Sequence, residues 1–112
     1  MTSGTLTLVA TPIGNLSDIS PRAVEALQAA DVVCCEDTRR TGMLLQHLGI
    51  SGKKYIVINE HTEFDACDDV VGKLLSGTEV ALVSDAGTPG ISDPGERLVK
   101  AAVLAGITVS SI

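Results

Sequence analysis

Aromatic side chains, cysteines and long apolar runs are all scarce in this sequence of 112 residues. Aromatic residues make up 2% of it, and two of its three cysteines, Cys34 and Cys35, are adjacent. That arrangement suits neither a disulfide framework nor a C-x-x-C zinc site, so we expect buried structural thiols and no metal. The apolar runs have strand length only, and no charged-then-apolar segment opens the chain. Transmembrane and secretory classes are therefore disfavoured, and we expect a cytoplasmic protein.

Basic side chains are also few, because 8 Lys and Arg residues stand against 14 Asp and Glu residues and leave a net charge of −6. Phosphate binding draws most of its affinity from Lys and Arg, so the composition disfavours nucleic-acid binding by this segment. Apolar residues reach 45%, which is too many for a disordered chain. We expect residues 1–112 to fold as one domain.

Five apolar runs recur at intervals of 23 to 28 residues, which is the length of a strand plus a crossover helix. The predicted strands are Leu6–Ala10, Val32–Cys35, Tyr55–Ile58, Val80–Val83 and Ile107–Ile112. The middle runs show little polar alternation, as expected of strands covered on both faces. The last run reaches the final residue, and we interpret this ending as a sign that the chain is a piece of a longer protein.

The segments between the runs carry helical periodicity and helix-end signals. Ser20-Pro21 and Asp93-Pro94 each provide an N-cap followed by a first-turn proline, and Thr62 is a further candidate cap. The helices are expected to stop at Gly49, Gly77 and Gly106, and the third to bury Phe64, Cys67, Val71 and Leu74. The alternation predicts a doubly wound α/β domain. It would have a mainly parallel five-stranded sheet, helices on both faces and right-handed crossovers.

Ligands of such sheets bind beyond the carboxyl ends of the strands, where two unusual segments follow predicted strands. The segment Thr11–Asp18 is a polar turn with a single glycine, so it is not a dinucleotide fingerprint. The segment Ser84–Gly95 holds three glycines, two prolines and two aspartates. It is longer than an ordinary βα loop and suits a polar ligand of adenosine size. Asp85 offers a carboxylate to a hydroxyl or a positive charge.

Candidate acid–base groups follow the second and third predicted strands. They are Glu36, Asp37, Glu60 and His61, with Arg39 as a possible substrate-positioning group. The alternative for Glu36 and Asp37 is the start of an N-capped helix, with both carboxylates favourable to its dipole and the arginines solvated. The spacing does not choose among the four, and His47 falls inside a predicted helix with no assigned role.

Three segments, Val9–Leu16, Cys35–Arg39 and Ser84–Gly95, together resemble the N-terminal domain of the ribosomal RNA small subunit methyltransferase I family. That family belongs to the tetrapyrrole methylase superfamily. The resemblance implies S-adenosylmethionine as cofactor and the ribose 2′-hydroxyl of a cytidine in 16S rRNA as acceptor. It also implies a second α/β domain, absent from this chain, with the cofactor in the cleft between the two.

Carried over position by position, the resemblance implies a set of cofactor-binding residues. These are Pro12, Gly14, Asp85, Ala86, Gly87, Thr88, Pro89, Ile91 and Asp93. Where tetrapyrrole methylases proper have Gly-Asp-Pro, this chain has Gly87-Thr88-Pro89, which favours the RNA branch.

The implied partners are 16S rRNA or the small ribosomal subunit, and a second copy in a homodimer. The basic surface for RNA would come from the second domain, from a second subunit, or from Arg39-Arg40 and Lys53-Lys54.

Two other functions remain open at this point. C-methylation of a tetrapyrrole would use the same fold and cofactor, but the scarcity of aromatic residues offers little for stacking a macrocycle. A flavodoxin-like or receiver-like binding module would use Glu36 and Asp37 as an acidic pocket. Receiver domains need a phosphorylatable Asp after a middle strand, however, and the third predicted strand ends in Asn59-Glu60.

Overall fold

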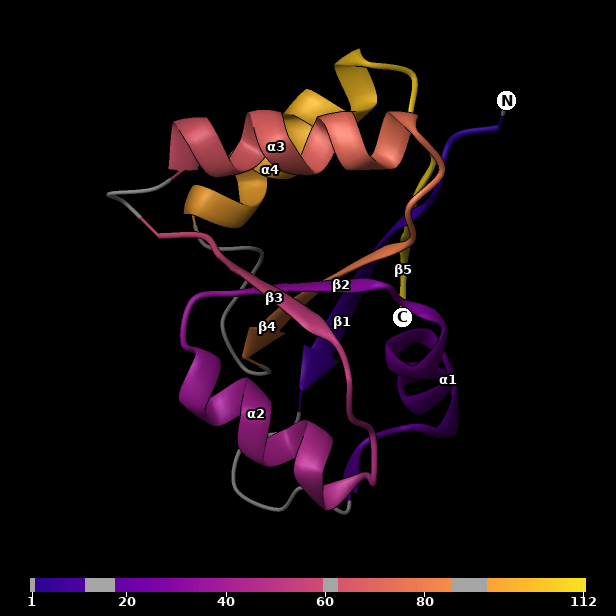
Figure 1. The fold of residues 1–112 in the computed structure, drawn as a ribbon, viewed down its shortest axis with the longest axis vertical. Helices are drawn as coiled ribbons and strands as arrows, with labels where there is room; N and C mark the ends of the chain where they lie inside the picture. The colour runs from indigo at the N-terminus through magenta and orange to yellow at the C-terminus, as the bar shows by residue number, and fades with distance from the viewer. Residues whose placement is uncertain (1, 12–17, 60–62, 86–92) are drawn as a thin grey trace.

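The computed structural model describes residues 2–11, 18–59, 63–85 and 93–112 (Figure 1). In these residues five strands alternate with four helices. Their bounds are β1 Leu6–Thr11, α1 Pro21–Ala29, β2 Val32–Cys35, α2 Thr38–His47, β3 Lys54–Val57, α3 Glu63–Leu75, β4 Val80–Asp85, α4 Asp93–Leu104 and β5 Val109–Ser111. The predicted α/β alternation is therefore confirmed.

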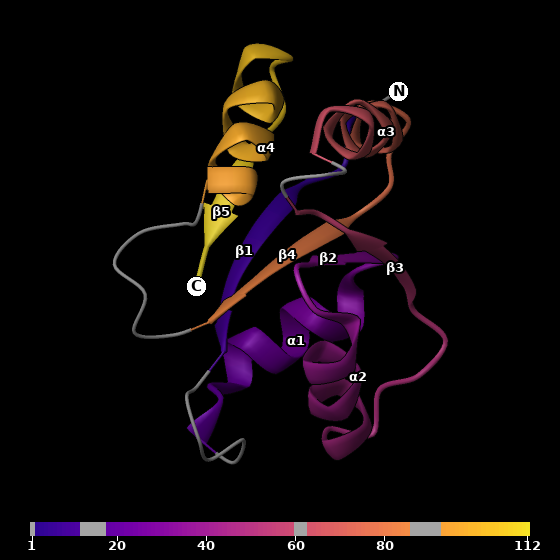
Figure 2. The same cartoon turned by 90° about the vertical axis from the view of Figure 1, so that its left-hand side faces the viewer.

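The strands form one sheet in the order β3-β2-β4-β1-β5, and every pair is parallel. The chain moves from β1 through β2 to β3 in one direction and returns through β4 to β5 in the other. Because crossover connections are right-handed, a helix lies on one face of the sheet when the chain moves in one direction across it, and on the other face when the chain moves back. Accordingly, α1 and α2 lie on one face and α3 and α4 on the other (Figures 1 and 2).

Each face of the sheet has its own apolar cluster. The cluster under α3 and α4 is built on alternate strand residues, Leu6, Val32, Cys34, Val80 and Leu82. The cluster under α1 and α2 uses the intervening ones, Val9, Val33 and Ala81. Because the central strands are buried on both faces, their sequences are continuous apolar runs and not alternating ones.

The predicted helix ends at Ser20 and Gly49 agree with the structure, whereas Asp93, predicted as an N-cap, is the first residue of α4. The Ser20 hydroxyl accepts a hydrogen bond from the Ala23 amide at 3.1 Å, and Pro21 is the first residue of α1. Gly49 follows α2 with φ +72°, a left-handed conformation that glycine adopts at little cost. The proposed cap Thr62 lies outside the described residues.

Several details of the predicted elements differ from the structure, and β3 spans Lys54–Val57 instead of the predicted Tyr55–Ile58. Ser84 and Asp85, expected in a loop, belong to β4, because parallel pairing with β1 continues through Ala10 and Thr11. β5 begins at Val109 and not at Ile107. In α3 the buried residues include Ala66 and Val70, whereas Val71 is half-buried, because the helix packs against α4 as well as the sheet.

The N-terminal segment before β1 is fixed against the turn between α3 and β4. The Gly4 amide donates to the Leu74 carbonyl at 2.7 Å, and the Thr5 amide donates to Glu79 Oε2 at 3.1 Å. A Cβ atom at Gly4 would lie 1.9 Å from the Thr78 carbonyl oxygen. Since that neighbour is backbone, it cannot rotate away, and only glycine fits.

We therefore expect Gly4→Ala to lower the free energy of unfolding by about 1–3 kcal/mol, the usual range for overpacking. Gly72→Ala is the matched control, because Gly72 lies within α3 and no atom is within 4 Å of its added Cβ. There the same change should stabilise the chain by about 0.5–1 kcal/mol, since alanine favours the helix interior. Urea unfolding of both variants measures the difference, and a Gly4→Ala midpoint equal to that of the unchanged chain would contradict the packing argument.

Candidate functional site

The carboxyl ends of β1 and β4 lie side by side in the middle of the sheet. Thr11 pairs in register with Asp85, and both are the last residues of their strands. The Thr11 hydroxyl donates a hydrogen bond to the Ser84 carbonyl at 3.1 Å, and Thr11 is only 7% exposed. This bond ties together two strand ends that lie more than seventy residues apart in sequence. The segments 12–17 and 86–92 therefore start from adjacent, fixed points.

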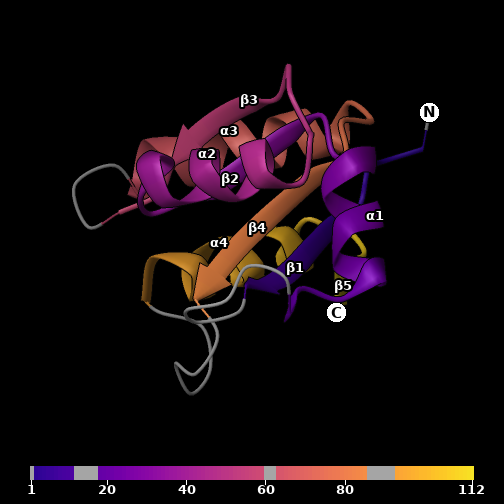
Figure 3. The same cartoon turned by 90° about the horizontal axis from the view of Figure 1, so that it is seen from below.

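The chain leaves these two strand ends for opposite faces of the sheet. β1 leads to α1 on one face, and β4 leads to α4 on the other (Figure 3). In open parallel sheets, ligands bind where neighbouring strands send their connections to opposite sides. The edge beyond Thr11 and Asp85 is therefore the candidate ligand site of the described structure.

β2, the neighbour of β4, brings Glu36 and Asp37 to the same edge of the sheet. Asp37 is the N-cap of α2: its Oδ1 accepts from the Arg39 amide at 2.8 Å and lies 3.6 Å from Arg39 Nε. The backbone hydrogen bond, aided by the Arg39 guanidinium, holds the pKa of the Asp37 carboxyl below its usual value. Glu36 is exposed beside it. The helix-start interpretation of this segment is thus confirmed for Asp37.

A buried thiol and hydroxyl fasten α2 to the end of β2. Burial raises the pKa of the Cys35 thiol, and a hydrogen bond from the Thr41 side chain partly offsets this rise. Thr41 is 5% exposed, and its amide donates to the Asp37 carbonyl at 3.3 Å. The hydrogen bond between the Thr41 and Cys35 side chains links the first turn of α2 to the last residue of β2.

The cysteines are buried and free, as predicted. Burial raises the pKa of the Cys34 thiol to about 12, helped by the nearby Cys35 and Cys67. A thiol with so high a pKa stays protonated at neutral pH and is a poor nucleophile. Cys34 is therefore a core residue of β2 and contributes no chemistry to the site.

The structure describes only some of the predicted site residues. Glu36, Asp37 and the backbone of Asp85 lie at the carboxyl edge, and Asp93 begins α4. The others lie outside the described residues: Pro12, Gly14, Glu60, His61, Ala86, Gly87, Thr88, Pro89 and Ile91. Their predicted roles stay predictions.

Among the described residues, the buried polar side chains of this edge are Thr11 and Thr41. The sequence includes Thr11 only as the first residue of a polar segment, and it does not single out Thr41. Threonine is a common strand residue and a neutral one in a helix, so neither attracts notice by type. A threonine at the carboxyl end of a central strand indicates a bond between two strand ends only once the neighbouring strand is known.

Neither a metal site nor a membrane span is found in the described ranges. Residues 2–11, 18–59, 63–85 and 93–112 contain no group of three or more His, Cys, Asp or Glu side chains placed to hold a metal ion. In the same ranges, no helix has both the length and the apolar character needed to cross a membrane.

Comparisons with known proteins support the resemblance noted in the sequence. The family model described as Tetrapyrrole (Corrin/Porphyrin) Methylases matches residues 5–112. A ribosomal RNA small subunit methyltransferase I from Streptococcus pyogenes is 52% identical over 99% of this chain and 38% of its own length. The corresponding protein of Synechocystis is 53% identical over 97% of this chain and 39% of its own length. The chain therefore spans well under half the length of these curated relatives.

A solved structure with the same fold is the uroporphyrin-III-C-methyltransferase from Thermus thermophilus. The match between the two covers 97% of this chain and 46% of the Thermus protein, with a TM-score of 0.72 and 19% sequence identity. At that identity the likeness concerns the fold alone, and it agrees with the parallel α/β architecture described above.

The cap geometry at α2 leads to a prediction for Asp37. Asparagine caps helices as well as aspartate does, so Asp37→Asn should melt close to the unchanged chain at neutral pH, whereas Asp37→Ala should melt lower. Because the native pKa is lowered, the carboxylate stabilises the fold above its ordinary pKa and loses this effect as the pH falls. Thermal melts from about pH 3 to 7 should show less acid dependence in the Asn variant. Equal melting of all three chains would refute the cap.

The buried Cys34 thiol leads to a prediction at alkaline pH. Burial raises its pKa in the folded chain to about 12, from an ordinary value of 9.0. The folded state holds the proton more tightly, so stability is present below pH 9.0 and is lost as the pH rises towards 12. The loss is about 1.4 kcal/mol per pH unit. Urea unfolding of Cys34→Ala should show a flatter pH dependence than that of Gly72→Ala, and equal slopes would contradict the assignment.

Proposed function

Because the chain belongs to the tetrapyrrole (corrin/porphyrin) methylases, we propose that it is the S-adenosylmethionine-binding part of a methyltransferase acting on small-subunit ribosomal RNA. The observation that carries this proposal is the adjacency of the β1 and β4 ends at Thr11 and Asp85. The RNA acceptor is suggested by the relatives, whose names describe ribosomal RNA small subunit methyltransferases. Family membership leaves no support for the flavodoxin-like or receiver-like alternative.

The residues of this edge suit the proposed cofactor. Thr11 and Ser84 hold the two strand ends together, and the segment that follows β4 is rich in small residues. Residues that would hold the cofactor are Pro12, Gly14, Asp85, Ala86, Gly87, Thr88, Pro89, Ile91 and Asp93. When bound, S-adenosylmethionine supplies an electrophilic methyl group.

The protein's own task is to orient the acceptor hydroxyl and remove its proton. Positioning of this kind is worth several kcal/mol of barrier, and a general base about 10²–10⁴-fold in rate. Of the two described candidates, Asp37 already caps α2, and its lowered pKa makes it a weak proton acceptor. Glu36 at the same strand end is therefore the better candidate, with Glu60 and His61 as further ones.

The finer expectations rest on the resemblance. We propose the 2′-hydroxyl of a cytidine in 16S rRNA as the acceptor, a two-domain protein of which this chain is the cofactor-binding domain, a homodimer and a cytoplasmic location. The coverage of only 38% of the Streptococcus relative supports the second of these. The scarcity of aromatic residues, at 2% of the chain, weighs against a tetrapyrrole acceptor.

Calorimetric titration of S-adenosylmethionine tests the proposal. It would be carried out on the chain itself and on a hybrid protein in which this chain replaces the matching segment of the Streptococcus pyogenes relative. We expect the hybrid to bind at micromolar concentration and Thr11→Val to weaken binding about 3- to 10-fold, the worth of one hydrogen bond. Thr11→Ser keeps the hydroxyl and should restore affinity, and Gly72→Ala is the remote control. A folded hybrid that binds no cofactor would contradict the proposal.

The same hybrid identifies the acceptor. It should transfer labelled methyl groups to small ribosomal subunits and not to a porphyrinogen. The labelled RNA should resist alkaline cleavage at one position, since the 2′-oxygen is the nucleophile in that cleavage. Transfer to the porphyrinogen instead would favour the tetrapyrrole alternative.

A further inference from the structure

We propose that the outer surface of α2, made by Arg39, Arg40 and Met43, binds the phosphate backbone of the RNA substrate. This inference rests on the proposed function and assigns the place where the RNA meets this domain. The helices differ in charge. The segment Thr38–His47 contains two arginines and no acidic residue, although the whole chain carries a net charge of −6.

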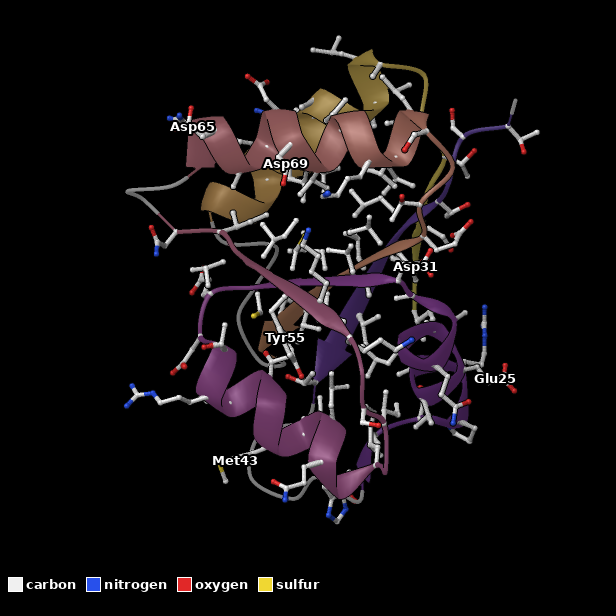
Figure 4. All side chains as sticks on the ribbon, viewed as in Figure 1. Glu25, Asp31, Met43, Tyr55, Asp65 and Asp69 are labelled. Carbon is white, nitrogen blue, oxygen red and sulfur yellow. The ribbon has the colours of Figure 1, made fainter. Side chains whose placement is uncertain are left out.

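The opposite face of the sheet has the opposite charge. α3 contains Glu63, Asp65, Asp68 and Asp69 against a single lysine, Lys73. Figure 4 shows Asp65 and Asp69 on α3, across the sheet from Met43 on α2. An approaching polyanion is therefore repelled from the α3 side and attracted to the α2 side.

The groups of the α2 surface are exposed to solvent. The Arg39 side chain is 91% exposed, and Met43, one helical turn later, is 65% exposed. In Figure 4 the Met43 side chain points away from the body of the protein. Arg39 lies 3.6 Å from Asp37, but so exposed an ion pair contributes little and yields readily to a phosphate.

Three lysines lie against groups of the protein itself. Lys53 Nζ donates to the carbonyls of Gln28, at 2.7 Å, and of Ala30, at the end of α1. Lys73 lies 3.8 Å from Asp69, and Lys100 lies 3.4 Å from Glu96. Of the two basic pairs expected to supply RNA contacts, Arg39-Arg40 is better placed than Lys53-Lys54, because both arginines are exposed at the start of α2 whereas Lys53 binds the end of α1.

The position of α2 connects this surface to the proposed reaction. α2 follows β2 directly, and β2 is the neighbour of β4 in the sheet. A phosphate bound by Arg39 and Arg40 would therefore lie at the same edge as Glu36 and the ends of β1 and β4. Arginine suits this role because its planar guanidinium can bind phosphate through two parallel hydrogen bonds.

The test is fluorescence anisotropy with a labelled single-stranded oligoribonucleotide, titrated with the chain at several KCl concentrations. Arg39→Ala/Arg40→Ala should weaken binding at low salt about tenfold. It should also reduce the slope of log K against log salt by about 1.4, the release expected for two phosphate contacts on a single strand. Lys73→Ala/Lys100→Ala removes equal charge from the α3 and α4 side and should leave the slope unchanged. Arg39→Lys/Arg40→Lys should keep most of the slope.

Two results would overturn the proposal. Equal effects of the two alanine pairs would mean that net charge governs binding and not the α2 surface. Absence of RNA binding by the unchanged chain would show that the α2 surface does not bind RNA. Circular dichroism checks that each variant is folded. S-adenosylmethionine titrated into the hybrid protein carrying the same substitutions separates the two proposals, because retained cofactor binding would leave the methyltransferase proposal standing while the RNA surface fails.

Discussion

The parallel pairing of β1 with β4 is the interaction on which the rest of the structure depends. It runs in register over six residues, from Leu6 with Val80 to Thr11 with Asp85. Without it the sheet would separate into β3-β2-β4 and β1-β5, and both apolar clusters would be cut through. A parallel pair cannot be closed by a short turn, so the chain between β1 and β4 must run through a long connection, which here holds α1, β2, α2, β3 and α3. The N-terminal segment strengthens the pair at its other end, where Thr5 binds Glu79.

The same pairing decides where ligand chemistry can take place. Two connections that are far apart in sequence start from neighbouring strand ends and diverge to opposite faces. Thr11 fixes their separation through the Ser84 carbonyl, and β2 places the Glu36–Asp37 turn on the other side of β4. The capping role of Asp37 and the contact between Cys35 and Thr41 make that turn part of a rigid framework. Rigid placement is what an active site needs from its supporting shell.

Much of the fold can be predicted from the sequence because its signals are local. The cap at Ser20 involves the amide three residues later, and the cap at Asp37 involves the amide two residues later. Strand order is different, since nothing near β1 indicates that β4 lies on one side and β5 on the other. The extension of β4 to Asp85 and the burial of Thr11 both follow from that order. They could not be predicted from the residue types alone, and neither could the site geometry that depends on them.

Charge shows why a whole-chain average is a poor guide to an interaction surface. A net charge of −6 indicates that the chain binds RNA poorly, and the acidic residues of α3 agree with that expectation for the face on which α3 lies. The fold, however, places the acidic helix α3 on one face and the basic helix α2 on the other. The reason is that α2 and α3 connect strands in opposite directions across the sheet. Lys73 and Lys100 each lie near an acidic residue one turn away in the same helix, whereas the acidic neighbour of Arg39 is Asp37, the cap that precedes α2. Topology thus divides an acidic chain into two faces of unlike charge, and the arginines of α2 lie near the edge where the strands end.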